Sequence, residues 1–262
     1  MKLEVLSRHP AGAARPTPLL FVHGAWHGAW CWAEHFLDDF AAQGYAAYAL
    51  SLRGHGGSEG RARLRWTRLA EYVDDVAQVA AQLPAPPVLI GHSMGGGIVQ
   101  KYLETHAAPA GVLLAALPPT GVLATTLRLA AQHPWEFLQI NARWSLYPLV
   151  RTPALAREAF FSEALPEERV RAYHAQLQDE SYLAFLDMLI LNLPRPARVR
   201  TPLLVLGGAA DTVFHPHAIE ATARAYGTQA TLFPDMAHDM MLEPGWQRVA
   251  QTIRKWLNER GL

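Results

Sequence analysis

The stretch that decides the fold is Val88-Leu89-Ile90-Gly91-His92-Ser93-Met94-Gly95-Gly96-Gly97, in which a short apolar run leads directly into Gly-x-Ser-x-Gly. A chain that passes from a strand to a helix within a few residues holds its central residue in a sparsely populated backbone conformation. Gly91 and Gly95 flank this residue because a Cβ at either position would collide as the two arms of the turn approach. We therefore predict that Ser93 stands exposed at the end of a strand, placed to act as a nucleophile.

Runs typical of buried strands alternate with amphipathic segments along most of the chain. Strands are predicted at residues 19–22, 46–50, 88–90, 111–116, 203–206 and 228–233. Helices are predicted at residues 31–43, 69–83, 98–103 and 246–257. This alternation favours an α/β fold, in which helices cover both faces of a mostly parallel central sheet.

The segment 118–197 interrupts the alternation. It contains apolar residues at helical spacing, such as Tyr182, Phe185, Leu186 and Leu189, and no convincing strand. We interpret it as a helical cap over the carboxyl edge of the sheet, where ligands of open α/β sheets bind. The predicted domains are therefore a core of residues 1–117 and 198–262 and a cap of residues 118–197.

A serine nucleophile needs a base, and the base needs a third group to orient it. Asp211 follows the strand predicted at 203–206, and His238 follows the strand predicted at 228–233. Both then lie at the sheet edge that carries Ser93. The chain order Ser, Asp, His differs from the orders found in chymotrypsin and subtilisin. Together these three residues predict a catalytic triad.

Acyl transfer also requires donors for the oxyanion that forms on the substrate carbonyl. The loop His23-Gly24-Ala25-Trp26 follows the first predicted strand, so one of its backbone N–H groups can face the nucleophile. Met94, in the first turn after Ser93, supplies a second N–H at a helix N-terminus. A tight structural turn at His23-Gly24 is compatible with this role, because backbone donors require no particular side chain.

Composition narrows the class of protein. The 262 residues include 23 basic and 23 acidic side chains without a basic block, so nucleic acid is not expected as a partner. The single cysteine, Cys31, cannot form an internal disulfide, and no run approaches the roughly 18 apolar residues of a membrane span. The short histidine spacings lack a zinc-like ligand set, so no metal is expected. We predict a soluble, cytoplasmic protein without a cofactor, and the sequence leaves a homo-oligomer open.

With these features, the chain resembles the α/β-hydrolase fold family, of the serine esterase type. The residues that carry the resemblance are His23-Gly24, Arg53-Gly54-His55-Gly56-Gly57-Ser58, Gly91 to Gly96, Asp211 and His238. The resemblance covers nearly the whole chain outside the cap. It implies a cap inserted after the sixth strand, a triad of Ser93, Asp211 and His238, and an oxyanion hole formed by the amides of Ala25 and Met94. It also makes the loop 53–58 mainly structural.

The tandem motif His23-Gly24-Ala25-Trp26-His27-Gly28-Ala29-Trp30 is similar to the branch that contains plant methylesterases and hydroxynitrile lyases. The lyases of that branch carry a lysine directly after the catalytic histidine, whereas this chain has Asp239. Cyanohydrin cleavage is therefore disfavoured. Epoxide hydrolases and haloalkane dehalogenases of the fold use an aspartate nucleophile, so Ser93 argues against both.

The function that these features favour is a carboxylesterase that cleaves small to medium apolar or aryl esters through an acyl-enzyme. The candidate substrate-binding residues are aromatic: Trp26, Trp135, Trp144 and Phe185. A carbon–carbon-bond hydrolase of ring-cleavage products is an alternative if Arg143 or Arg151 receives a substrate carboxylate. A cofactor-free dioxygenase and a non-catalytic ligand receptor on the same scaffold are further alternatives.

Overall fold

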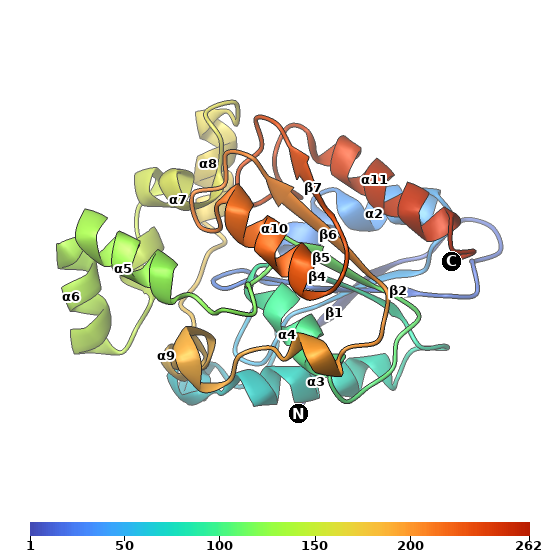
Figure 1. Cartoon of the computed structure of the whole chain (residues 1–262), viewed down its shortest axis with the longest axis horizontal. Helices are drawn as coiled ribbons and strands as arrows, with labels where there is room; N and C mark the ends of the chain where they lie inside the picture. Colours follow the sequence, from blue (N-terminus) through green and yellow to red (C-terminus); the bar gives the residue numbers. More distant parts are fainter.

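A single seven-stranded sheet lies at the centre of the molecule (Figure 1). The structure is a computed structural model that describes all of residues 1–262. The strand order is β1-β3-β2-β4-β5-β6-β7, and only the pairing of β1 with β3 is antiparallel. The strands are β1 Val5–Arg8, β2 Leu19–Val22, β3 Ala47–Leu50, β4 Val88–His92, β5 Gly111–Leu114, β6 Leu203–Gly208 and β7 Ala230–Phe233. The predicted α/β architecture with a mostly parallel sheet is confirmed.

Helices cover both faces of the sheet because successive side chains of each strand point to opposite faces. In β2, Leu19 and Phe21 belong to one apolar core and Leu20 and Val22 to the other. The first core is closed by α1 (Trp30–Ala33), α2 (Phe36–Ala42) and α11 (Trp246–Asn258). The second is closed by α3 (Leu69–Ala80), α4 (Met94–Tyr102) and α10 (Pro216–Ala225). None of the helices combines the length and the apolar character needed to cross a bilayer.

The segment 118–197 between β5 and β6 contains helices and no strand. Its elements are α5 Leu123–Gln132, α6 Pro134–Arg143, η2 Tyr147–Val150, α7 Pro153–Phe160, α8 Glu167–His174, α9 Tyr182–Leu186, η3 Asp187–Leu191 and the start of η4 Pro196–Arg198. Figure 1 shows α5 and α6 standing to one side of the sheet. One expectation is corrected: the segment follows the fifth strand in chain order, not the sixth, because a single antiparallel strand precedes the parallel ones.

Two further details differ from the sequence-based expectation. Strand β1 was not predicted, because its residues lie half-exposed at the edge of the sheet and show no buried apolar run. The helix predicted at 31–43 is divided into α1 and α2 around His35, whose φ of −144° and ψ of −51° are not helical. The short 3₁₀ helix η1 (Arg61–Trp66) precedes α3. Neither difference changes the edge of the sheet at which β4, β6 and β7 end.

Candidate active site

Ser93 occupies the tight turn between β4 and α4. Its φ of 51° and ψ of −118° lie outside the conformations that a residue with a Cβ adopts easily, at a cost of about 1–3 kcal/mol. The turn is possible because its neighbours are glycines: a Cβ on Gly91 would lie 2.5 Å from the Gly95 carbonyl oxygen. A Cβ on Gly95 would collide with the carbonyl oxygens of Val22 and His23. The surrounding backbone therefore fixes Ser93 in this position.

Asp211 and His238 are in direct contact at the carboxyl edge of the sheet. His238 Nδ1 donates a hydrogen bond of 2.8 Å to Asp211 Oδ2, and both side chains are buried. The other carboxylate oxygen, Oδ1, accepts from the backbone N–H groups of Val213 (2.7 Å) and Phe214 (2.9 Å). Because Nδ1 carries the proton, Nε2 of His238 keeps a lone pair that can accept one.

His92 places His238 beside the turn that carries Ser93. The two imidazole rings lie 4.8 Å apart, and His92 Nε2 donates to the backbone carbonyl of His238 at 3.1 Å. Burial and the neighbouring His238 lower the pKa of His92 to about 3, so His92 is neutral. His92 directly precedes Ser93 in the chain, so its hydrogen bond to the His238 carbonyl holds the backbone of His238 next to the serine turn.

The cluster of His92, His238 and Asp239 has the residue types of a metal site, with candidate ligand atoms within 4.8 Å of one another. Two of these groups already have partners. His238 Nδ1 is bonded to Asp211, and His92 Nε2 to the His238 carbonyl. His92 Nε2, the nitrogen that lies 3.5 Å from Asp239 Oδ1, carries the proton of this bond and has no lone pair for an ion, and we assign no metal to the cluster.

Ser93 lines a cavity of about 90 Å³, together with Ala25 and Met94, the two predicted oxyanion donors. Thirteen of the sixteen lining residues are hydrophobic, so the cavity suits an apolar group. Met94 is the first residue of α4, and N–H groups of a first helical turn have no partner within the helix. The structure thus brings a strained serine and a free helix N–H to one apolar cavity.

The four aromatic residues proposed for substrate binding separate into two pairs. Trp26 and Phe185 line the cavity that contains Ser93. Trp135 and Trp144 line neither this cavity nor the neighbouring one, and their exposed fractions are 62% and 44%. Trp144 packs instead against Trp66 on the surface. We correct the expectation for Trp135 and Trp144, whose helical segment turns them outward to solvent.

The loop that contains Ala25 is held at successive carbonyl groups. His27 Nδ1 donates to the carbonyl of Ala25 at 2.7 Å, and the backbone N–H of Gln178 donates to the carbonyl of Trp26 at 3.0 Å. Trp26 itself has a φ of 65°, in the left-handed region that favours glycine. These bonds stabilise a turn that a tryptophan would not adopt alone.

His23 ties the start of this loop to the neighbouring strand. Its Nδ1 donates to the Gly24 carbonyl at 2.7 Å, and its Nε2 accepts from the backbone N–H of Leu52 at 3.0 Å. This pairing requires the neutral imidazole, and burial lowers the pKa of His23 well below its ordinary value. Gly24 must lack a Cβ, because one would lie 2.8 Å from His92 Nδ1 and 3.0 Å from Ser93 Cβ.

His27 and Asp239 form a second buried histidine–carboxylate pair, with His27 Nε2 2.9 Å from Asp239 Oδ2. Burial alone would lower the pKa of His27, but the Asp239 carboxylate outweighs it and raises that pKa. Burial alone would raise the pKa of Asp239, and His27 lowers it. Both nitrogens of His27 face acceptors, the Ala25 carbonyl and the Asp239 carboxylate, and the doubly protonated ring is the form that donates to both. Asp239 lines neither cavity, so the residue after His238 faces the protein interior.

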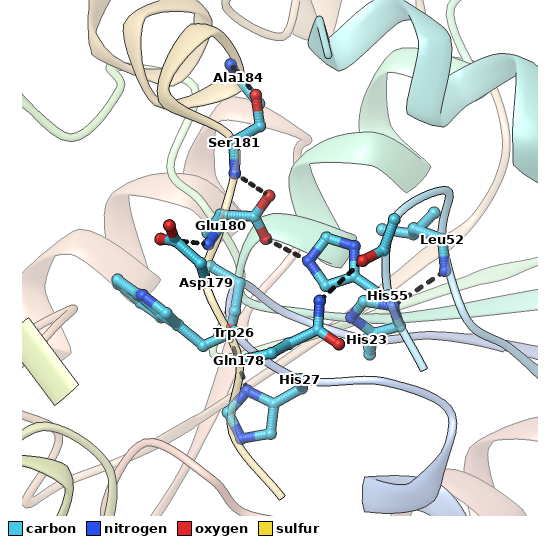
Figure 2. A network of polar contacts seen from close by, with 12 residues as sticks. His23, Trp26, His27, Leu52, His55, Gln178, Asp179, Glu180, Ser181 and Ala184 are labelled. Carbon is cyan, nitrogen blue, oxygen red and sulfur yellow. Dashed lines mark hydrogen bonds and ion pairs between the residues drawn. The ribbon is translucent and has the colours of Figure 1, made fainter. Parts of the chain in front are cut away.

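The end of the helical segment is joined to the core by a polar network (Figure 2). His55 Nε2 and Glu180 Oε2 lie 3.0 Å apart, and both side chains are fully buried. Burial alone would raise the pKa of Glu180, but His55 lowers it, so the carboxylate is charged. The Gln178 side chain adds two hydrogen bonds to backbone groups of the loop 53–58. This loop, expected to be structural, anchors the residues 178–181.

Sequence reasoning missed the contribution of α5 to the cavity. Thr125, Thr126 and Leu129 of this helix line it, as does Val122 at its N-cap. The spacing of Val122, Thr126 and Leu129, at steps of four and three, is a helical face and could have indicated this. Two of the cavity residues are threonines, which a search for apolar or aromatic side chains overlooks.

Comparisons with known proteins identify the family of the chain. Residues 19–252 match the model of the alpha/beta hydrolase family, and the chain belongs to this family. The chain is 26% identical over 249 residues to a monoacylglycerol lipase of Mycolicibacterium smegmatis, covering 86% of this chain and 82% of that protein. It is 24% identical over 239 residues to methylesterase 18 of Arabidopsis thaliana, covering 84% and 89%.

The fold also resembles that of solved structures. The crystal structure of a monoacylglycerol lipase from Paleococcus ferrophilus superimposes with a TM-score of 0.74 and covers 99% of this chain and 100% of that one. The sequence identity is 21%, so this likeness concerns the fold. The family and its esterase and lipase relatives identify the protein as a hydrolase of the α/β class.

Proposed function

We propose that the protein is a serine carboxylesterase that cleaves small to medium apolar or aryl esters through a Ser93, His238 and Asp211 triad. The observation that carries this proposal is the 2.8 Å hydrogen bond from His238 to Asp211, beside a serine held in a strained turn. A buried carboxylate that orients the base is what serine-based acyl transfer requires. The esterase and lipase names of the relatives support the same reaction class.

In the proposed reaction, His238 Nε2 takes the proton of the Ser93 hydroxyl as the oxygen attacks the ester carbonyl. Asp211 holds the imidazole in the required tautomer and stabilises the imidazolium that forms. The N–H groups of Ala25 and Met94 donate to the oxyanion of the tetrahedral intermediate. His238 then protonates the leaving alcohol, and a water molecule activated by His238 releases the acyl group from Ser93.

The apolar cavity supports an apolar group on one side of the ester. Its lining comes from the core at Ala25, Ser93 and Met94 and from the helical segment at Leu129 and Phe185. We therefore propose that residues 118–197 form a cap over a core of residues 1–117 and 198–262. Trp26 and Phe185 are the proposed substrate contacts. A cytoplasmic location, the lack of a nucleic-acid partner and the possible homo-oligomer stay predictions from the sequence.

The alternative of a carbon–carbon-bond hydrolase depended on a cap arginine that receives a substrate carboxylate. Arg143 and Arg151 line neither cavity, and Arg151 pairs with Glu136 at 3.1 Å. No observation favours this alternative through those two residues. The cofactor-free dioxygenase and the ligand receptor likewise have no specific support in the geometry, and we do not propose them.

A fluorophosphonate probe tests the nucleophile directly. We expect a single adduct on Ser93 by peptide mapping, and turnover of p-nitrophenyl esters reduced about 10⁴-fold or more in Ser93→Ala. Ser7→Ala, in the edge strand β1, is the matched control and should keep full activity and labelling. Near-normal turnover in Ser93→Ala, or labelling that avoids Ser93, would contradict the mechanism. Varying acyl length separately from the alcohol then maps the cavity.

A further inference from the structure

A second cavity adjoins the one that contains Ser93, and its volume is about 200 Å³. Four side chains line both cavities: Trp26, Leu129, Leu149 and Val213. Each of the four is only partly buried, so solvent reaches the wall that the cavities share. The two cavities differ in character, because six of the fourteen residues around the second are not hydrophobic. A substrate with one apolar and one polar arm would match this pair of cavities.

The positions of Ser93 and His238 relative to the two cavities assign the two arms of an ester. The His238 ring packs against Phe214, which lines the first cavity, and against Phe160, which lines the second, at centroid distances of 5.5 and 6.1 Å, so the base is close to both cavities. Ser93 and the proposed oxyanion donors line only the first. The leaving alcohol must lie on the side of the base that protonates it. The acyl group therefore fits the first cavity and the alcohol the second.

The charges in the second cavity point to the chemistry of that alcohol. Glu158 is the carboxylate among the lining residues, and His133 Nε2 pairs with it at 2.9 Å. Arg128, on α5, has no such partner: its hydrogen bonds go to the backbone carbonyls of Thr212 and Val213, both from Nη2. Nη1 and Nε of Arg128 keep donors for another group. A guanidinium with free donors at a cavity wall suits a planar anion such as a carboxylate.

We propose that the second cavity binds the leaving alcohol of the substrate through an anionic group, and that Arg128 receives this group. The substrate class is then an ester of an apolar acyl chain with a hydroxy acid. This inference rests on the proposed esterase function, because it assigns the alcohol side of the same reaction. Hydrolysis consumes the ester and water, and it releases the fatty acid and the free hydroxy acid.

Two matched esters test the proposal: the hexanoyl ester of 4-hydroxybenzoate and that of 4-hydroxybenzamide, which differ by one charge. We expect Arg128→Gln to lower kcat/KM for the carboxylate ester by about tenfold or more, as for the loss of a charge-assisted hydrogen bond. For the amide ester, kcat/KM should change little in Arg128→Gln. Arg143→Gln is the control, since Arg143 is exposed and lines neither cavity. Arg128→Lys, which keeps the charge without the planar fork, replaces Arg128→Gln if the latter does not fold.

A binding measurement separates failure of this inference from failure of the proposed function. Calorimetric titration of Ser93→Ala with 4-hydroxybenzoate should give a Kd that rises about tenfold when Arg128→Gln is added. Equal losses for both esters, or an unchanged Kd, would overturn the anionic subsite. If neither ester is hydrolysed by the wild-type protein, the esterase proposal fails, and the Kd comparison still decides the role of Arg128.

Discussion

His27 and Asp239 are 212 residues apart in the chain and form one fully buried ion pair with a length of 2.9 Å. His27 also donates to the carbonyl of Ala25, and Asp239 directly follows His238. The pair therefore connects the loop of a proposed oxyanion donor to the loop of the proposed base. One charge interaction therefore joins both loops, and neither of its residues lines either cavity.

Removing one charge of this pair should destabilise the protein in a pH-dependent way. Asp239→Asn leaves His27 buried without its counterion, and we expect a loss of about 3 kcal/mol in the free energy of unfolding. The pKa of His27 is raised, so its contribution is complete below the usual histidine value of about 6.5 and disappears as pH rises through the raised pKa. The pKa of Asp239 is lowered, so its contribution is lost only as pH falls through that lowered value.

Urea unfolding at about pH 5.5 and about pH 9 checks this expectation. The free energy of unfolding of the wild type should exceed that of Asp239→Asn by more at the lower pH than at the higher pH. Asp38→Asn is the control, because Asp38 pairs with Arg8 on the exposed surface, where an ion pair contributes at most about 1 kcal/mol. If the free energies of unfolding of wild type and Asp239→Asn differ little, or by an amount that does not depend on pH, the pair is not ionised.

Asp211→Asn should impair catalysis far more than folding. The amide of asparagine can still accept from the backbone of Val213 and Phe214, but its NH₂ group favours the wrong tautomer of His238. We expect kcat to fall about 10⁴-fold with a nearly unchanged melting temperature. Asp235→Asn changes an exposed carboxylate in the loop just before His238 and should leave kcat unaltered. A mild effect of Asp211→Asn on kcat would exclude Asp211 as the orienting group.

Gly24→Ala tests how closely the oxyanion loop packs on the nucleophile turn. The new methyl group would lie 2.8 Å from His92 Nδ1, so the loop must move, at a cost of about 1–3 kcal/mol. We expect lower kcat as well as lower stability, because Ala25 moves with the loop. Gly12→Ala is the matched control, since a Cβ there meets nothing within 4 Å. Thermal unfolding and kcat, measured together, should leave Gly12→Ala unchanged; full activity in Gly24→Ala would disprove the close packing.

Phe185→Ala should weaken binding of the acyl group. Phe185 is partly buried and lines the apolar cavity, and removing its phenyl group forfeits about 1.5–3 kcal/mol of apolar contact with an acyl chain that covers it. KM for a hexanoyl ester should rise about tenfold or more, while an acetyl ester, too short to reach the ring, changes little. Trp135→Ala removes a larger but exposed aromatic group and should leave KM unchanged. Equal effects of both substitutions would show that the cavity does not hold the acyl chain.

The sequence predicts those parts of the fold that local pattern determines. The apolar runs of β2, β4 and β6 are continuous because both faces of these strands are buried, and glycine spacing identifies the turn at Ser93. The edge strand β1 has only one neighbour and half-exposed side chains, so it leaves no such pattern. The break in the helix predicted at 31–43 depends on the backbone of His35, which a periodic pattern does not encode.

The sequence predicts those residues of the candidate site whose place follows from their position after a strand. It does not predict those whose place depends on tertiary contacts. Asp211 and His238 follow strands that end at one edge, so chain order alone placed them together. The pairing of His27 with Asp239 has no periodic signal, because it joins two loops through a single contact. The outward orientation of Trp135 and Trp144 depends on how the helices of the segment 118–197 pack, and aromatic content does not determine that.

The network around Glu180 determines how the helical segment can open. Lifting residues 118–197 as one rigid body would separate the buried His55–Glu180 pair and break the bonds of Gln178 to the loop 53–58. At the other end, α5 contributes no buried side chain. Thr125 and Arg128 bind this helix to the core only through hydrogen bonds to the carbonyls of Thr212 and Val213. The segment is therefore fixed more firmly at residues 178–181 than at α5, and we expect an opening motion to begin at α5.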